Sequence, residues 1–191
     1  MLHRLSLVSL ALFAMPAIAA PVNYVVDSSH TYPSFEADHL GGVSTWRGKF
    51  NSSSGSVTMD RDAGTGEVEI VIDAASIDFG HDGMNDHARR ADILDVEQFP
   101  AATYRGKLVD FVEGNPTRVD GELTLRGVTR SVPLTIHRFK CIEHPRSKKE
   151  VCGADASASF QRDDFGIDYA KAGGFDMGIV VRVQIEVRAA D

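Results

Sequence analysis

Strict alternation of apolar and polar residues is the feature that most constrains how this chain can fold. In VVRVQIEVRA, residues 180–189, every second side chain is apolar, and charged or amide side chains fall between them. A period of two places the two sets on opposite faces of a β-strand. Residues 67–74, 121–127 and 131–139 repeat the pattern. The sequence therefore predicts an all-β, antiparallel fold.

One segment, residues 80–100, breaks this alternation. Its apolar residues recur at helical spacing, Asn85 or Asp82 can cap its start, and Pro100 ends it. The recurring residues are Ala88, Ala91 and Leu94. We predict a single domain of eight or so strands with one helical insertion. Such strands must hide their edges in a sandwich or a closed barrel, and periodicity does not separate these two.

The first 19 residues have the pattern of a secretory signal peptide. His3 and Arg4 precede an apolar run over residues 5–15, and Ala17-Ile18-Ala19 fits a cleavage site. The run is shorter than the roughly 20 residues that span a bilayer, and no later stretch is apolar enough. We expect cleavage after Ala19, a soluble mature domain over residues 20–191 and a periplasmic location. The net charge of −7 argues against nucleic acid as a partner.

Two cysteines, Cys141 and Cys152, flank a charged loop. In an oxidising compartment we expect them to form a disulfide that closes a hairpin. The alternative is a zinc site that adds His144, although a structural zinc site prefers four ligands at tighter spacing.

Histidines are the other candidates for metal or acid–base chemistry. If residues 30–39 form one strand, His30 and His39 face opposite sides and lie roughly 30 Å apart, so they cannot share a metal. His39 then belongs to the buried face with Phe35. His81 and His87 are six residues apart, where helical metal pairs favour four. We find no nucleophile elbow, phosphate loop or dinucleotide fingerprint.

Four blocks of the sequence, taken in order, resemble the YceI family of exported, lipocalin-like proteins. The blocks are an N-terminal set (Asp27, His30, Thr31, Phe35 and His39), a helical set (Asp86, His87, Arg89, Asp92, Asp95, Phe99 and Pro100), GELTLRGVTRSV at 121–132 and RDDFG at 162–166. The resemblance implies an extended, antiparallel, eight-stranded β-barrel with the helix against its mouth. It also implies a long apolar cavity that binds a polyisoprenoid lipid or an isoprenoid quinone.

Candidate ligand-binding residues follow from that expectation, with ordinary core packing as the alternative for each. They are Phe35, His39, Phe50, Ile72, Ile77, Phe79, His87, Arg89, Leu94, Phe99, Leu123, Leu125, Phe160 and Phe165. The guanidinium group of Arg89 suits a polar or phosphorylated lipid head. We expect the disulfide to staple a loop that lies away from the cavity.

Two classes of function remain open from the sequence. The favoured one is a non-catalytic periplasmic carrier or reservoir whose ligand is a long-chain isoprenoid, with no cofactor and no bound metal. The alternative is a metal-assisted periplasmic enzyme that uses His30, His39, His81 or His87. The sequence does not fix the oligomeric state, and a homodimer is among the open assemblies.

Overall fold

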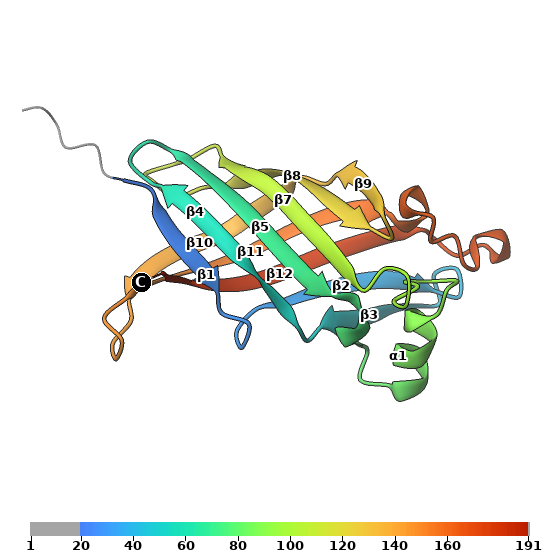
Figure 1. Cartoon of the computed structure of the whole chain (residues 1–191). Coiled ribbons are helices and arrows are strands. Elements are labelled where there is room, and N and C mark those ends of the chain that lie inside the picture. Colours follow the sequence, from blue (N-terminus) through green and yellow to red (C-terminus); the bar gives the residue numbers. More distant parts are fainter. Residues whose placement is uncertain (1–19, 191) are drawn as a thin grey trace, which may run out of the picture.

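The computed structural model describes residues 20–190, so the predicted signal peptide, residues 1–19, lies outside the described residues. Within them, eight antiparallel strands form a closed ring, because the last strand pairs with the first (Figure 1). In order around the ring they are β1 (Val22–Val26), β4 (Ser53–Asp60), β5 (Thr65–Asp73), β7 (Ala101–Val109), β8 (Arg118–Leu125), β10 (Leu134–Glu143), β11 (Glu150–Gln161) and β12 (Gly178–Ala189). The predicted all-β barrel is confirmed, and the sandwich alternative is excluded.

Strand β12 explains why the ring is elongated. It pairs with β11 from Gly178 to Arg188, and this long ladder is built from the alternating segment that the sequence shows most clearly. On its other edge, β12 pairs with two strands in succession. Residues 187–189 pair with β1, whereas residues 179–184 pair with β2 (Tyr32–His39). The barrel wall is therefore continuous at one end and divides at the other.

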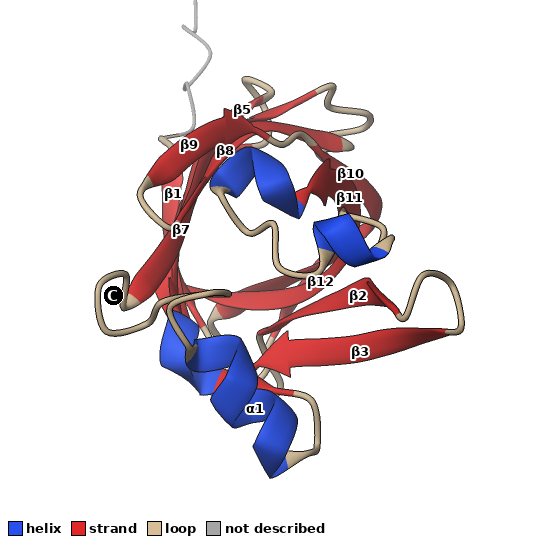
Figure 2. Cartoon of the chain, turned by 90° about the vertical axis from the view of Figure 1, so that its right-hand side faces the viewer, coloured by secondary structure: helices blue, strands red, loops and turns tan. Residues whose placement is uncertain are grey.

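At the divided end, β2 continues into an extension of the sheet. It pairs with β3 (Ser44–Phe50), which pairs with β6 (Ile77–Asp78). Strand β9 (Val128–Ser131) pairs with β8 on the opposite side of the ring. Figure 2 looks at this end and shows β2 and β3 diverging from the ring, with the helix α1 beside them. Short 3-10 helices complete the described chain: η1 (Ala74–Ser76), η2 (Arg162–Phe165) and η3 (Lys171–Gly173).

The predicted helix is shorter than its apolar spacing indicated. Helix α1 covers Asp82–Arg89, and its N-cap is His81, whose Nδ1 accepts a hydrogen bond from the Met84 amide at 3.2 Å. The prediction that Asn85 or Asp82 caps the helix was wrong. Leu94 is buried all the same, because its amide bonds to Ala88 O at 3.0 Å and folds the chain back under the helix. Leu94 is therefore apolar because the folded-back chain buries it, and not because the helix continues to that residue.

Buried side chains form two clusters. The larger one lies along the ring of strands and includes Tyr24, Met59 and Tyr104, and the smaller one lies under α1 and includes Ile77 and Leu94. Leu125 contacts both clusters. Among residues 20–190, no helix has the length and hydrophobicity needed to cross a lipid bilayer.

Candidate functional site

The inward faces of the strands line an elongated cavity of about 540 Å³. Strand β12 shows its extent, because five of its alternate residues line the cavity: Ile179, Val181, Val183, Ile185 and Val187. At about 3.3 Å per residue, the run from Ile179 to Val187 spans roughly 26 Å. The cavity therefore follows most of the length of the barrel.

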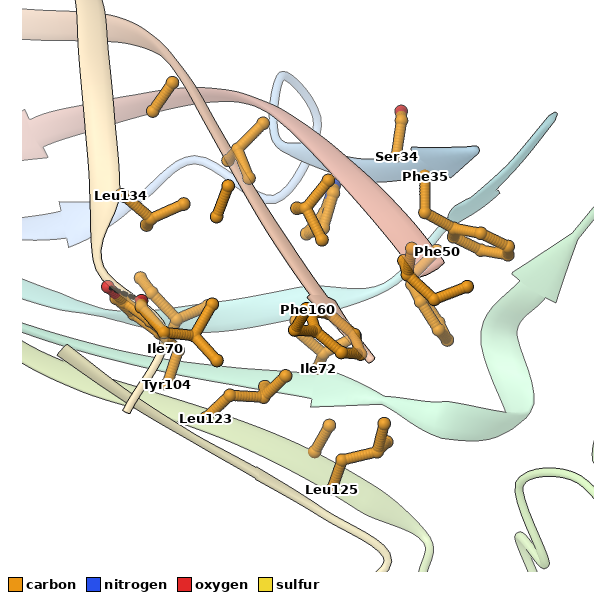
Figure 3. A pocket seen from close by; sticks show the side chains of 18 of the residues that line it. Ser34, Phe35, Phe50, Ile70, Ile72, Tyr104, Leu123, Leu125, Leu134 and Phe160 are labelled. Carbon is orange, nitrogen blue, oxygen red and sulfur yellow. Dashed lines mark hydrogen bonds between the residues drawn. The ribbon is translucent and has the colours of Figure 1, made fainter. Parts of the chain in front are cut away.

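Small residues on β11 leave this space empty. Ala154, Ala156 and Ala158 all line the cavity and pair with the larger residues of β12. A methyl group fills far less of the barrel interior than the Leu, Ile and Phe side chains that come from other strands. Figure 3 shows Ile70, Ile72, Tyr104, Leu123, Leu125 and Phe160 projecting toward the same space. The lining between these strands is thus predominantly apolar.

The two ends of the cavity differ in their exposure to solvent. At one end the lining residues Met59, Cys152 and Val187 are 2%, 1% and 5% exposed. At the other end, Leu40 and Tyr169 are 56% and 42% exposed. The second end is the divided end of the barrel, where β2, β3 and α1 lie. We call it the mouth.

Aromatic and imidazole rings surround the mouth. His39 packs edge-on against Trp46 at 5.3 Å and against Phe175 at 6.3 Å between ring centroids. His87, on α1, packs edge-on against Tyr169 at 4.8 Å. These contacts join the β2–β3 hairpin, the helix and the segment around η3. The mouth is consequently formed by three elements that are far apart in the sequence.

Two charged residues, Asp38 and Arg162, also line the cavity at this end. The amides of Asp176, Gly42 and Gly41 donate to the Asp38 carboxylate at 3.0, 2.6 and 3.0 Å, and these bonds lower its pKa. Burial lowers the pKa of the Arg162 guanidinium. The Asp38 carboxylate therefore accepts hydrogen bonds from backbone amides, and these bonds hold the tip of the β2–β3 hairpin against the η3 segment.

Comparison with known proteins agrees with this architecture. Residues 24–189 match the family model described as a YceI-like domain. The chain belongs to the YceI family. Protein YceI of Escherichia coli is 30% identical over 164 residues, which cover 85% of this chain and 84% of that protein. A UPF0312 protein of Pseudomonas aeruginosa is 31% identical, with 87% and 86% covered. A UPF0312 protein of Vibrio parahaemolyticus is 35% identical, but the match spans 64% of this chain and just 65% of that protein.

Solved structures share the YceI fold at lower sequence identity. BcnA of Burkholderia cenocepacia aligns with a TM-score of 0.68 and 20% identity, covering 84% of this chain and 98% of that one. A domain from Saccharophagus degradans, described as a polyisoprenoid-binding domain implicated in plant cell wall breakdown, aligns with a TM-score of 0.64 and 18% identity. This alignment covers 88% of our chain and 99% of that domain. At such identities, these likenesses support the fold.

Most of the residues singled out from the YceI resemblance line the cavity. They are Phe35, His39, Phe50, Ile72, Ile77, Phe79, His87, Leu94, Leu123, Leu125 and Phe160. The alternation explains this result, since residues of one parity on a strand share a face. Phe35, Ala37 and His39 lie on the inward face of β2, as that parity indicated.

Three of the predicted residues lie outside the lining. Arg89 donates from Nε to Ala75 O at 2.8 Å and from Nη2 to Ile77 O at 3.4 Å, so its guanidinium ties α1 to the backbone and does not reach the cavity. Phe165 is 1% exposed and packs behind Phe160, with 5.1 Å between ring centroids. Phe99 packs beside Gly127 in the loop after β8. Their side chains support the wall from outside.

The disulfide between Cys141 and Cys152 is present and joins directly paired residues of β10 and β11. The loop that it closes, residues 142–151, contributes no residue to the lining, as expected, although Cys152 itself is one of the lining residues at the closed end. Residue 152 faces inward because it shares its parity with Ala154 and Ala156. A zinc site at these cysteines is excluded, since both sulfurs are bonded to each other.

The four candidate histidines, named for the enzyme alternative, do not converge on one site. His30 precedes β2, in the turn after β1, so the assumption of a single strand over residues 30–39 was wrong. Its Nδ1 bonds to Asp27 Oδ2 at 2.8 Å and lies 3.9 Å from Glu186 Oε2, at the outer surface. Arg188 also contacts the Asp27 carboxylate, and this cation would repel a metal ion there. His81 caps α1, whereas His39 and His87 line the mouth.

The electrostatics of the Asp27–His30 pair are those of a structural ion pair. The hydrogen bond that His30 donates to Asp27 and the negative charge of Asp27 raise the pKa of His30. Partial burial raises the pKa of Asp27, but hydrogen bonds from Ser29 and His30 outweigh it and lower that pKa below its usual range. This pair fastens the turn between β1 and β2.

Sequence reasoning missed several lining residues. The inward residues of β12 and the alanines of β11 are recognisable from parity alone, although the predicted set consists mainly of aromatic and larger aliphatic side chains. Trp46, Tyr169 and Arg162 are different, because they reach the mouth through the packing of distant segments. Arg162 belongs to the RDDFG block, which was the one available signal for it.

Proposed function

We propose that this YceI-family protein is a non-catalytic periplasmic carrier that binds the tail of a polyisoprenoid lipid or isoprenoid quinone inside its barrel. The observation that carries the proposal is the apolar cavity, about 540 Å³ in volume and lined along some 26 Å of β12. Its volume lies within the range of small-molecule sites, roughly 300–1,000 Å³, and its length suits a slender molecule.

The energetics favour a long tail over a short one. A buried carbon group contributes roughly 0.8 kcal/mol, so one five-carbon unit contributes about 4 kcal/mol before any cost is subtracted. Association costs about 4–15 kcal/mol. A single unit is therefore too short, and several units are needed for firm binding. The name of the Saccharophagus domain, a polyisoprenoid-binding domain, supports the same class of ligand.

Two parts of the proposal rest on separate arguments. The periplasmic location rests on the signal-like segment at residues 1–19. The non-catalytic role rests on the lining, in which apolar side chains predominate and the few polar groups gather at the mouth. The alternative of a metal-assisted enzyme has less support, because His30 lies apart from His39 and His87 and shares its carboxylate with Arg188.

The test is to express the full chain with export, purify it without detergent or an affinity tag, and analyse an organic extract by mass spectrometry. We expect one long isoprenoid per chain. Stripped protein titrated with isoprenoids of increasing length should bind with rising affinity that levels off once the cavity is full. Metal analysis of the same sample addresses the enzyme alternative. An extract without such a lipid, together with titrations that show no dependence on tail length, would refute the carrier function.

A further inference from the structure

We propose that Arg162 binds the polar end of the ligand, and that this end is an uncharged hydrogen-bond acceptor such as a quinone carbonyl, in preference to a phosphate. The inference rests on the proposed function and specifies the class of headgroup. It concerns a residue that no sequence argument assigned, and it replaces Arg89, whose guanidinium is held by backbone carbonyls.

The position of Arg162 suits contact with a headgroup. It follows the last residue of β11 and opens η2, two residues after Phe160, whose pair with Ile179 is the outermost inward-facing pair on these two strands. Its amide donates to Met177 O at 2.9 Å, and this bond fixes its backbone beside β12. A tail that lies along the barrel would thus place its polar end beside Arg162.

Arg162 also retains hydrogen-bonding capacity. Its Nη2 donates to Tyr169 O at 2.8 Å, which orients the side chain toward the η3 segment. Within residues 20–190, the guanidinium makes no other hydrogen bond and no ion pair with a carboxylate. A guanidinium group has five N–H donors, so most of them remain for a ligand or for water. Partial burial strengthens a bond formed there, because fewer waters compete for the donors.

The surrounding charges select against a phosphate. The carboxylates of Asp163, Asp38 and Asp168 all act on Arg162. Lys171 lies 2.5 Å from the Asp163 carboxylate and compensates for it. Asp164 also acts on Lys171, and Arg126 donates to Gly166 O at 3.2 Å, so this group of residues holds four carboxylates against three cations. A lipid phosphate would be repelled, whereas an uncharged carbonyl still accepts a charge-assisted hydrogen bond.

The experiment uses the full-length exported protein after removal of bound lipid. Three ligands with the same isoprenoid tail are compared: a quinone, a monophosphate and the plain hydrocarbon. Binding is followed by calorimetry and by the fluorescence of Trp46, the one tryptophan of the chain, which lies at the mouth. The variants are Arg162→Gln and Arg162→Lys. Arg182→Gln is the matched control, because Arg182 is an exposed arginine of β12 that pairs with Glu36 outside the cavity.

We expect the normal protein to bind the quinone more tightly than the monophosphate. Arg162→Gln should weaken quinone binding about tenfold to a hundredfold, the range for a hydrogen bond to a charged group, and leave hydrocarbon binding unchanged. Arg162→Lys should retain part of the quinone affinity, and Arg182→Gln all of it. Thermal unfolding checks that the variants are folded, and Arg162→Lys preserves the test if Arg162→Gln is unstable.

The outcomes separate this inference from the proposed function. If the tails bind but Arg162→Gln leaves quinone binding unchanged, or if the monophosphate binds more tightly than the quinone, the headgroup assignment is wrong and the carrier function stands. If the normal protein binds none of the three ligands, both proposals fail.

Discussion

Replacing the cavity alanines of β11 by phenylalanine should shorten the longest tail that the barrel accepts. Ala158, Ala156 and Ala154 pair with Val181, Val183 and Ile185, so they lie at increasing depth from the mouth. Along β12, these levels are roughly 7, 13 and 20 Å from Ile179, at about 3.3 Å per residue. A phenyl ring at each level would block the space beyond it.

The magnitude follows from the tail that is excluded. Each five-carbon unit that no longer fits costs up to about 4 kcal/mol of burial. Because a tail can bend and partly re-enter, we expect a loss of at least tenfold in affinity per excluded unit, about 1.4 kcal/mol. Ala158→Phe should limit binding to the shortest tails, Ala156→Phe to tails of about half the full length, and Ala154→Phe to longer ones. Tails that stop before the block should bind nearly as they do to the normal protein.

The assay is a titration of each stripped variant with isoprenoids of graded length, followed by Trp46 fluorescence. Ala101→Phe is the control, because it makes the same change at an exposed position of β7. Crowding in a packed interior costs typically 1–3 kcal/mol, so unfolding of each variant is measured alongside. If the three variants share one length limit, or if the deepest block gives the shortest limit, the tail does not enter the cavity through the mouth.

Two further predictions concern stability. Replacing both Cys141 and Cys152 by serine should lower the free energy of unfolding by about 3 kcal/mol, the value for a loop of this size. The intact normal protein should weigh two hydrogens less than its reduced form. Alkylation of either thiol before reduction would contradict the presence of the disulfide. The Asp27–His30 pair should stabilise the fold from above the unfolded pKa of Asp27, 3.8, to the raised folded pKa of His30, because the contribution of His30 is complete below 6.5 and is lost at higher pH. Urea unfolding of His30→Gln should therefore lack the decline above pH 6.5 that the normal protein shows, and an unchanged pH profile would rule out this role for the pair.

The strands and the lining were predictable because parity is a local property. On a strand, the side of the sheet that a residue faces depends on its neighbours in sequence, so Leu123 and Leu125 could be placed before the fold was known. The number of strands in the ring was less certain, because closure depends on the pairing of β1 with β12, at opposite ends of the domain. The resemblance to the YceI family supplied this information, which the alternation does not contain.

The errors arose where distant segments meet. Leu94 showed helical spacing because the chain folds back beneath α1, and Arg89 looked free because the carbonyls of Ala75 and Ile77 that hold it belong to another segment. Arg162 reaches the mouth because the η3 segment and the β2–β3 hairpin close around it. Such neighbours are fixed by the tertiary structure, and short-range patterns do not specify them.

The size of the cavity links ligand binding to stability. At about 24 cal/mol per Å³, a volume of about 540 Å³ corresponds to roughly 13 kcal/mol of apolar contacts that a filled barrel would have and an empty one lacks. This equals the burial of about three isoprene units and is comparable to the whole stability of a typical domain, about 5–15 kcal/mol. A ligand that fills the barrel must therefore also stabilise it.

The two ends of the barrel differ in the bonds that hold their strands and loops together. At the closed end, the Cys141–Cys152 bond and the hydrogen bond from Tyr24 to Glu150, 2.7 Å long, join strands around the base of the cavity. At the mouth, the hairpin tip is held to the η3 segment by the Asp38 carboxylate and by ring contacts. Because these contacts are all noncovalent whereas the closed end carries a disulfide, the mouth is the end that can separate at the lower cost. Entry of the proposed tail at the mouth then needs no change in the ring of paired strands.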